Sequence, residues 1–96
     1  MLQQITIQTT DAKRFKPLLQ SALKREAQLL DRAIVRTRQA LKPYEMRHHI
    51  TSEEFERQFK AREIEESLDY LDWWSEIEAL RHLEAQRASL DGARLD

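Results

Sequence analysis

Residues 42–55 read KPYEMRHHITSEEF, and this stretch decides the fold because one helical pattern ends in it and another begins. Pro43 lacks a backbone N–H, so it should stop or kink a helix that arrives from the N-terminal side. Thr51 and Glu54 have the T-x-x-E spacing of a capping box, in which a side-chain oxygen caps the first helical turn. The stretch therefore predicts a chain reversal followed by a short helix over residues 52–61.

A long helix is predicted on the N-terminal side of this reversal. Pro17 is tolerated in the first turn of a helix, so the helix is placed over residues 16–42, with Asp11 to Phe15 as a turn. Apolar residues recur along it at steps of three and four, which is the spacing of one helical face. This stripe consists of Leu19, Leu23, Ala27, Leu30, Ile34, Thr37, Leu41 and Tyr44.

A second long helix is predicted on the C-terminal side, over residues 67–90. Before it, Phe55 and Phe59 lie one turn apart in the short helix, so we expect them to close the hairpin end of the core. The apolar stripe of the last helix is wide enough to touch more than one neighbour. It consists of Leu71, Trp74, Ile77, Leu80 or Arg81, and Leu90, flanked by Tyr70, Trp73 and Leu83.

Residues 1–10 form an N-terminal arm. Ile5 and Ile7 alternate with polar residues, which predicts a short β-strand over Leu2 to Thr9 that needs something to pair with. The chain is thus predicted to be a single all-α domain of residues 1–96. Its expected architecture is an elongated antiparallel helical hairpin with a short helix at the bend and a short N-terminal β-strand.

The length of the predicted first helix indicates an elongated molecule. At about 1.5 Å per residue this helix would span roughly 39 Å, whereas a compact body of this size is only about 30 Å across. A two-helix seam buries little apolar surface to offset the entropy of the chain. We therefore expect a homodimer, a higher oligomer or a bound partner.

The composition excludes several classes of enzyme. The single glycine, Gly92, cannot supply a phosphate-binding loop, and the absence of cysteine removes thiol nucleophiles, disulfides and zinc–thiolate sites. Paired carboxylates occur, but general acid–base chemistry needs a desolvated pocket that a thin hairpin does not offer. His48, His49 and His82 do not have the spacing of metal ligands. We expect no enzymatic activity, no catalytic residue, no metal and no cofactor.

The longest uncharged stretch is residues 1–10, which contains three glutamines. It lacks the apolar core of a signal peptide or a membrane span. The sequence therefore predicts a cytoplasmic protein that is not embedded in a membrane.

The charge is distributed unevenly along the chain. Residues 11–47 carry ten basic and four acidic side chains, a net charge of +6, whereas residues 48–96 carry six basic and thirteen acidic ones, a net charge of −7. Such asymmetry is typical of two helices with complementary faces, of a nucleic-acid-binding surface, or of an acidic surface for a basic partner.

Nucleic-acid binding is one function that the basic half would serve, because phosphate contacts need a row of lysines and arginines. Against this, the basic residues fall on several helical faces, and no aromatic residue is interleaved with them for base stacking. The candidate residues are Lys13, Arg14, Lys16, Lys24 and Arg25, continued by Arg32, Arg36, Arg38 and Lys42.

Protein binding is indicated by the aromatic residues of the last helix. Trp73 and Trp74 point about 100° apart on a helix, so one can be core while the other faces a partner. Trp and Tyr are among the residues most enriched at binding hot spots, and nearby carboxylates would mimic the phosphates that a nuclease binds. The candidate partner-binding residues are Tyr70, Trp73, Trp74, Asp69, Asp72 and Glu76, in an acidic set that also includes Glu63, Glu65, Glu66 and Glu78.

Residues 44–59, YEMRHHITSEEFERQF, resemble the F-E-x-K-Y-G-M-S-S-E-E-F-x-x-x-F signature of small helical proteins that are encoded beside small toxins and labelled antitoxin components. Residues 69–74, DYLDWW, are similar to the D-x-D-F-x-x-W segment of the same family. The resemblance covers about residues 44–83. It implies a non-enzymatic protein that binds and neutralises a toxin, often a ribonuclease.

Two departures from this family pattern concern glycine. His48 and His49 stand where the family has Tyr-Gly, so a turn that glycine makes easily must be made by histidine, at positive φ. Residues 62–67 lack the glycine that usually follows the second helix, which leaves the start of the last helix open.

The expected function is therefore that of an antitoxin-like protein whose partner is a small toxin. Two alternatives stay open: a nucleic-acid-binding regulator that uses the basic first helix, and a structural homo-oligomer whose long helices associate in a bundle.

Overall fold

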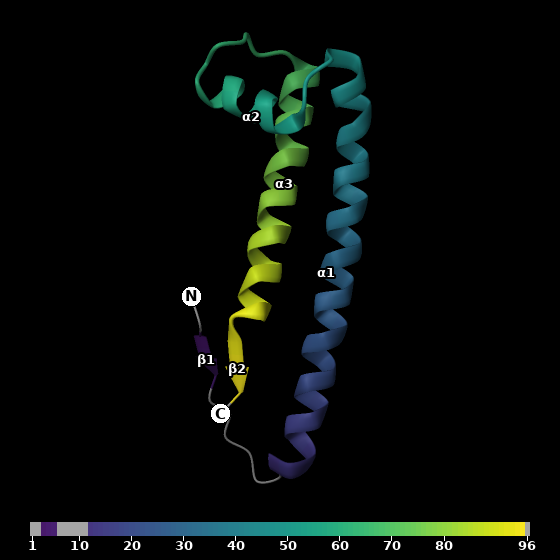
Figure 1. Ribbon diagram of the computed structural model, residues 1–96, viewed down its shortest axis with the longest axis vertical. Coiled ribbons are helices and arrows are strands. Elements are labelled where there is room, and N and C mark those ends of the chain that lie inside the picture. Colours follow the sequence, from purple (N-terminus) through teal and green to yellow (C-terminus); the bar gives the residue numbers. More distant parts are fainter. Residues whose placement is uncertain (1–2, 6–11, 96) are drawn as a thin grey trace.

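The structure, a computed structural model, describes residues 3–5 and 12–95. Within them the chain forms three helices, α1 (Ala12–His48), α2 (Ser52–Lys60) and α3 (Leu68–Asp91). Figure 1 shows α1 and α3 side by side and antiparallel, with α2 lying across the closed end. The principal extents are 58 × 23 × 17 Å. The predicted elongated helical hairpin with a short helix at its bend is confirmed.

Two three-residue strands lie at the open end of the hairpin. β1 (Gln3–Ile5) pairs in parallel with β2 (Ala93–Leu95), with Gln4 opposite Arg94. Of the strand predicted over Leu2 to Thr9, only Gln3–Ile5 falls within the described residues. The pairing segment β2 was not predicted, because three residues after a helix end carry no periodicity that sequence analysis can detect.

The apolar stripe predicted for the first helix is confirmed residue by residue. Each of its eight residues is buried or half-buried, and Leu30, Ile34 and Leu41 are fully buried. These three contribute to a core that α3 completes with Trp73 and Ile77. The predicted stripe is thus the face of α1 that packs against α3.

The predicted bounds of this helix, residues 16–42, were too short at both ends. At the N-terminal end, the turn assigned to Asp11 to Phe15 is helical from Ala12, and Pro17 lies inside the helix. Pro17 is the sixth residue of this helix, beyond the first-turn N–H groups that have no intrahelical acceptor, so it forfeits the backbone hydrogen bond to the carbonyl of Lys13.

At the C-terminal end, α1 continues through Pro43 to His48. The proline forfeits one backbone hydrogen bond of the helix. The residues beyond it pack on the core, because the rings of Tyr44 and His48 stack on Trp73 at centroid distances of 5.7 and 5.3 Å. These contacts hold the last turn helical, so Pro43 neither stops the helix nor marks the bend.

α2 begins as the capping signal predicts. Thr51 is the N-cap, and its Oγ1 accepts a hydrogen bond from the backbone N–H of Glu54 at 3.1 Å. The Glu54 carboxylate does not complete the box, because it accepts hydrogen bonds from Arg57 and Gln58 instead. The helix ends at Lys60, within one residue of the predicted end.

α3 begins after Ser67, which accepts a hydrogen bond from the backbone N–H of Tyr70 at 3.1 Å. The stripe predicted for this helix was correct at Ile77 and Leu80 and wrong at Leu71 and Trp74. Trp73, Ile77 and Leu80 are buried, whereas Leu71 remains 40% exposed and Trp74 is half-buried. The buried stripe runs through Trp73, which the prediction had placed at its flank. Trp73 is therefore the core tryptophan.

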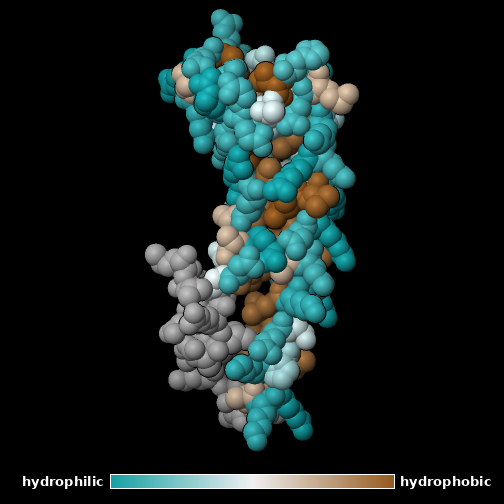
Figure 2. Space-filling model, viewed as in Figure 1, coloured by the Kyte–Doolittle hydropathy of each residue, from teal (hydrophilic) through white to brown (hydrophobic). Residues whose placement is uncertain are grey.

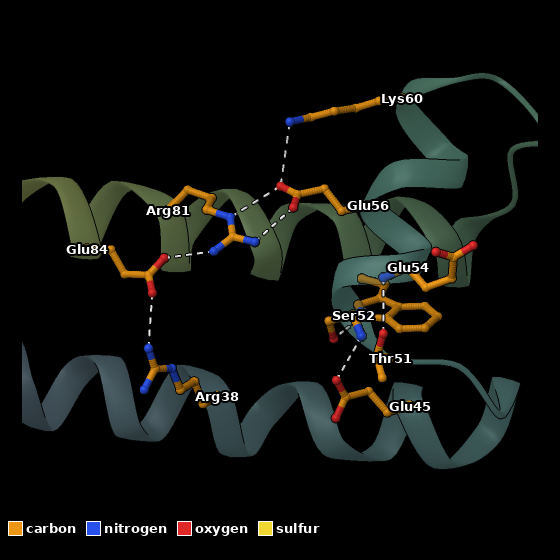
Figure 3. Close-up of polar contacts among 10 residues, drawn as sticks. Arg38, Glu45, Thr51, Ser52, Glu54, Glu56, Lys60, Arg81 and Glu84 are labelled. Atoms are coloured by element: carbon orange, nitrogen blue, oxygen red, sulfur yellow. Dashed lines mark hydrogen bonds and ion pairs between the residues drawn. The ribbon is translucent and has the colours of Figure 1, made fainter.

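Ion pairs cross the seam between the two long helices. Arg38 pairs with Glu84 at 3.1 Å, and Arg87 pairs with Asp31 at 2.9 Å. Figure 3 shows that Glu84 also forms an ion pair with Arg81 of α3. The Arg81 guanidinium pairs in addition with Glu56 of α2, at 2.8 Å. Part of the charge asymmetry of the sequence therefore reflects complementary charges on the two long helices, which was one of its three interpretations.

Most of the surface outside the seam is polar, with single exposed apolar side chains such as Leu18, Met46 and Leu68. Figure 2 shows hydrophilic residues over most of the visible face and apolar residues along the groove between α1 and α3. None of the helices in the described ranges combines the length and apolar character that a bilayer crossing requires.

Candidate functional site

The closed end of the hairpin, hereafter the tip, is built around Trp73. Its side chain is 0% exposed and stacks on Phe55, with ring centroids 3.9 Å apart and planes 3° from parallel. Tyr44 and His48 of α1 stack on the same indole, and Tyr70 packs against Phe55 at 5.4 Å. All three helices therefore meet on one buried aromatic residue.

Polar contacts fix the same residue in position. The Nε1–H of Trp73 donates to Oγ of Ser52 at 3.0 Å, and the backbone N–H of Ser52 donates to the Glu45 carboxylate at 2.8 Å. Figure 3 shows Glu45 on α1 directed toward the start of α2. Because Ser52 is 5% exposed, this hydroxyl satisfies an indole N–H that water does not reach. The tip is thus a platform held by both aromatic stacking and hydrogen bonds.

Two residues flanking α2 have left-handed backbone conformations. His49 has φ of 59° and Arg62 has φ of 56°. The first confirms the expectation that a histidine would adopt positive φ where the similar family has glycine. The second lies in the segment noted for its lack of glycine. Each conformation costs a non-glycine residue of the order of 1 kcal/mol, which the contacts of α2 with the rest of the tip must offset.

A hollow of about 480 Å³ opens beside this platform, between α2, α3 and the loop that joins them. Trp74 forms one wall and stacks on Phe59 at a centroid distance of 4.8 Å. Lys60 extends over the Trp74 ring, with Nζ 5.9 Å from the ring centroid. The full lining is Phe59, Lys60, Arg62, Ile64, Glu66 and Trp74.

The charges around the hollow are mixed. Lys60 is paired with Glu56 at 3.7 Å, whereas Arg62 and Glu66 make no side-chain ion pair within the described part of the chain. An apolar wall with unpaired charges at its rim is the anatomy of a protein-binding hot spot, in which an aromatic anchor is surrounded by polar contacts.

Predicted site residues do not form one surface. Trp73 is core, whereas Trp74 lines the hollow and stays half-buried. Asp72 lies two residues before Trp74, hence on nearly the opposite side of α3. The carboxylates of Asp69, Asp72 and Glu76 instead lie around Tyr44, whose pKa is raised by burial of the ring and then by these three charges.

Asp69 is engaged within the hairpin. It accepts hydrogen bonds from the His48 ring and from Arg47 of α1, the latter at 2.8 Å. The contact with His48 and the positive charge of Arg47 hold the Asp69 pKa below its ordinary value. Asp69 therefore ties the last turn of α1 to the first turn of α3, and it is not a free contact for a partner.

The remaining acidic residues of the predicted set fall into two groups, those paired within the hairpin and those without an ion pair among the described residues. Glu63 is paired with Arg57 at 3.1 Å. Five other members of the predicted acidic set have no ion pair among the described residues: Glu65, Glu66, Asp72, Glu76 and Glu78. These five leave the tip acidic.

The residues predicted for nucleic-acid contact lie along the first half of α1. Lys13, Lys16, Lys24 and Arg25 are exposed, but their spacing distributes them around the helix. Arg14 is also exposed and lies on the same segment. This predicted set does not form one contiguous row.

Sequence reasoning missed part of the hollow. Arg62 and Ile64 were noted only as part of residues 62–67, the segment without glycine, and Phe59 only as core. The absence of glycine from residues 62–67 was the single signal available, and the structure shows its consequence in the positive φ of Arg62, a feature that often marks a constrained site.

Among the described residues, no three His, Asp or Glu side chains group closely enough to hold a metal ion. In the comparisons with known proteins, no family model, curated protein or solved structure matches this chain.

Proposed function

We propose that the chain is a non-enzymatic protein-binding module that docks its partner in the hollow at the tip. The observation that carries this proposal is the position of Trp74. Its indole is half-buried, stacks on Phe59 and lines an open hollow, so a partner side chain can cover it without unfolding the hairpin. Hot-spot residues have this character: a large aromatic surface, ordered in advance and still accessible.

The class of partner is proposed from the sequence resemblance. An antitoxin-like protein binds a small toxin, and the unpaired carboxylates at the tip would attract a basic one. Glu66 at the rim of the hollow and Glu65 beside it add this attraction next to the apolar wall. Long-range attraction of this kind raises the association rate, whereas the aromatic anchor slows dissociation.

The test uses the product of the reading frame adjacent to this one, co-expressed with the chain. We expect the neighbouring product alone to arrest growth, and co-expression to relieve the arrest and yield a complex of fixed stoichiometry. Trp74→Ala should weaken that complex about 30-fold, equivalent to about 2 kcal/mol.

Met46→Ala is the matched control, because Met46 is an apolar residue that is 75% exposed and does not line the hollow. It should leave the affinity unchanged. Equal effects of the two substitutions, or a neighbouring product that neither arrests growth nor binds, would contradict the proposal.

A second candidate function is nucleic-acid binding. The observation that favours it is a row of arginines on one side of α1, formed by Arg25, Arg32 and Arg36, which fall within about 40° of one another at the spacing of an α-helix. Duplex DNA binding through this row would fall steeply with salt, with a slope that decreases by about one for each arginine removed. Binding that is absent at low salt would exclude it.

A further inference from the structure

The side of α1 that faces away from α3 carries a row of arginines. Arg32 lies two residues after buried Leu30 and two before buried Ile34, so it projects opposite to the core. Arg25 and Arg36 fall within about 40° of it around the helix. These three arginines are exposed and make no ion pair within the part of the chain that the structure describes.

Two exposed aliphatic side chains lie beside this row, one on each side. Leu29 is 49% exposed and Val35 is 52% exposed, and they point about 120° apart with the arginines between them. A hollow of about 620 Å³ lies here, lined by Leu29, Asp31, Arg32, Val35 and Arg36. We define the basic face as Arg25, Leu29, Arg32, Val35 and Arg36.

The carboxylates of α1 do not neutralise this face. Within the described residues of the helix they are Glu26, Asp31 and Glu45, and each projects about 100° or more from the middle of the row. Asp31 reaches the edge of the hollow, but its carboxylate is paired with Arg87 of α3 at 2.9 Å. Guanidinium groups spread over about three helical turns are therefore available to the negative groups of another molecule.

The order of residues across the basic face indicates which negative molecule fits it. A phosphate backbone offers no apolar group, so it would leave Leu29 and Val35 uncovered. Helices that lie on membranes bury a face whose middle is apolar, whereas here the arginines lie in the middle and the aliphatic side chains at the edges. An acidic amphipathic helix supplies both carboxylates for the guanidinium groups and apolar side chains for the hollow.

We propose that the basic face docks an acidic amphipathic helix of a partner protein. An apolar side chain of that helix enters the hollow, and carboxylates one turn before and after it pair with the arginines. The methylene stems of the arginines add to the apolar contact. The partner helix needs a length of about 16 Å to reach from Arg25 to Arg36. Figure 1 shows this part of α1 away from α2, so the contact is separate from the tip hollow and does not depend on it.

The probe for the test is a synthetic, fluorescently labelled peptide of about 18 residues, long enough to form a helix on binding. It carries leucine along one face and glutamates on both sides of the leucines. Fluorescence anisotropy measures its affinity for the full chain at about 0.15 M salt. A peptide of the same composition in scrambled order spreads these residues around the helix and should bind at least about tenfold more weakly.

The first pair of variants tests the charge. Arg32→Glu with Arg36→Glu reverses part of the row and should weaken binding of the ordered peptide at least about tenfold. Lys13→Glu with Lys16→Glu is the matched control, because it makes the same change of charge at two exposed residues of α1 outside the basic face. This control should weaken binding less than about threefold, since salt screens charges at that distance.

The second pair of tests separates the apolar contact from the charge. Leu29→Ser with Val35→Ser leaves the charge unchanged and should also weaken the ordered peptide about tenfold. A peptide with lysines in place of the glutamates should bind the Arg32→Glu, Arg36→Glu variant and not the wild type. This exchange of charges shows that the variant is folded and that the pairing is direct.

Four results would overturn the proposal. The ordered and scrambled peptides bind equally, the arginine variant behaves like its lysine control, or the lysine peptide does not bind the arginine variant. The fourth is a duplex DNA that binds more tightly than the ordered peptide, through the arginines and without a contribution from Leu29 and Val35. That result would assign the basic face to nucleic acid.

Discussion

The indole of Trp73 and the ring of Phe55 lie 3.9 Å apart and 3° from parallel, and both side chains are 0% exposed. Trp73 comes from α3 and Phe55 from α2, so this stack joins the short helix to the hairpin. It connects every element of the tip, because Tyr44 and His48 of α1 pack on the same indole. The stability of the tip therefore depends on a few large aromatic contacts.

Phe55→Ala should destabilise the protein by about 3–5 kcal/mol, because it removes a fully buried ring and leaves a cavity that the two long helices cannot close. Urea denaturation followed by tryptophan fluorescence measures this change. Met46→Ala, at a side chain that is 75% exposed, should change stability by less than about 0.5 kcal/mol. A loss at Phe55 no larger than that of the control would show that α2 does not depend on this stack.

Ser52→Ala tests the polar lock on Trp73. The substitution removes the acceptor of the buried indole N–H and leaves it unsatisfied, which should cost about 1–3 kcal/mol. In a Trp73→Phe background the same serine substitution should cost much less, since no indole N–H remains to be satisfied. Equal costs in the two backgrounds would mean that the hydroxyl of Ser52 stabilises something other than Trp73.

His49→Gly tests the strained turn before α2. Glycine adopts positive φ without steric cost, so this substitution should raise the free energy of unfolding by about 1 kcal/mol. His82→Gly is the matched control, because His82 is exposed in the middle of α3, where glycine should cost about 1 kcal/mol. Thermal denaturation of the two variants should therefore shift in opposite directions, and a loss of stability in His49→Gly would contradict the assignment of strain.

Much of this fold was predictable from local signals. The stripe of α1 repeats over seven turns, so errors at single positions do not change the face that is buried. The caps at Thr51 and Ser67 also depend on a few neighbouring residues, and both predicted helix starts are confirmed within one residue. Local chemistry is sufficient wherever one short segment decides the outcome.

The features that were mispredicted depend on contacts between segments. Pro43 was expected to end the first helix, but Tyr44 and His48 continue it because Trp73, 25 or more residues away, gives them a surface to pack on. The register of the α3 stripe was ambiguous between two adjacent tryptophans. It is decided by Phe55 and Ser52 of α2, which no analysis of α3 alone can include.

The candidate site was predicted only in part for the same reason. Trp74 was singled out because tryptophan is enriched in hot spots, but Arg62 and Ile64 join it only because the loop after α2 folds back toward α3. The carboxylate of Asp69 was assigned to a partner, whereas Arg47 and His48 approach it across the hairpin. Residue type indicated the anchor, and tertiary structure decided its neighbours.

The ion pair between Glu56 and Arg81 predicts a pH dependence of stability. The hydrogen bond from Arg81, opposed by partial burial, lowers the Glu56 pKa from its ordinary value of 4.5. A carboxylate with a lower pKa in the folded state stabilises the fold above its unfolded pKa, and this contribution is lost as the pH falls through the folded pKa. Glu56→Gln should therefore cost about 1 kcal/mol at pH 7, because it removes the charge that Arg81 pairs with.

At a pH low enough to protonate Glu56 in both the folded and the unfolded state, the wild type and Glu56→Gln should unfold at the same urea concentration. Glu65→Gln provides the comparison, since Glu65 is exposed and has no ion pair among the described residues, and it should match the wild type at both pH values. The Glu56 side chain is only 14% exposed. Added salt should therefore reduce the stability difference between the wild type and Glu56→Gln at pH 7 less than it would reduce the contribution of a fully exposed ion pair. A difference between the wild type and Glu56→Gln that persists at acidic pH would show that the glutamate stabilises α2 through its shape and packing, with no net contribution from its charge.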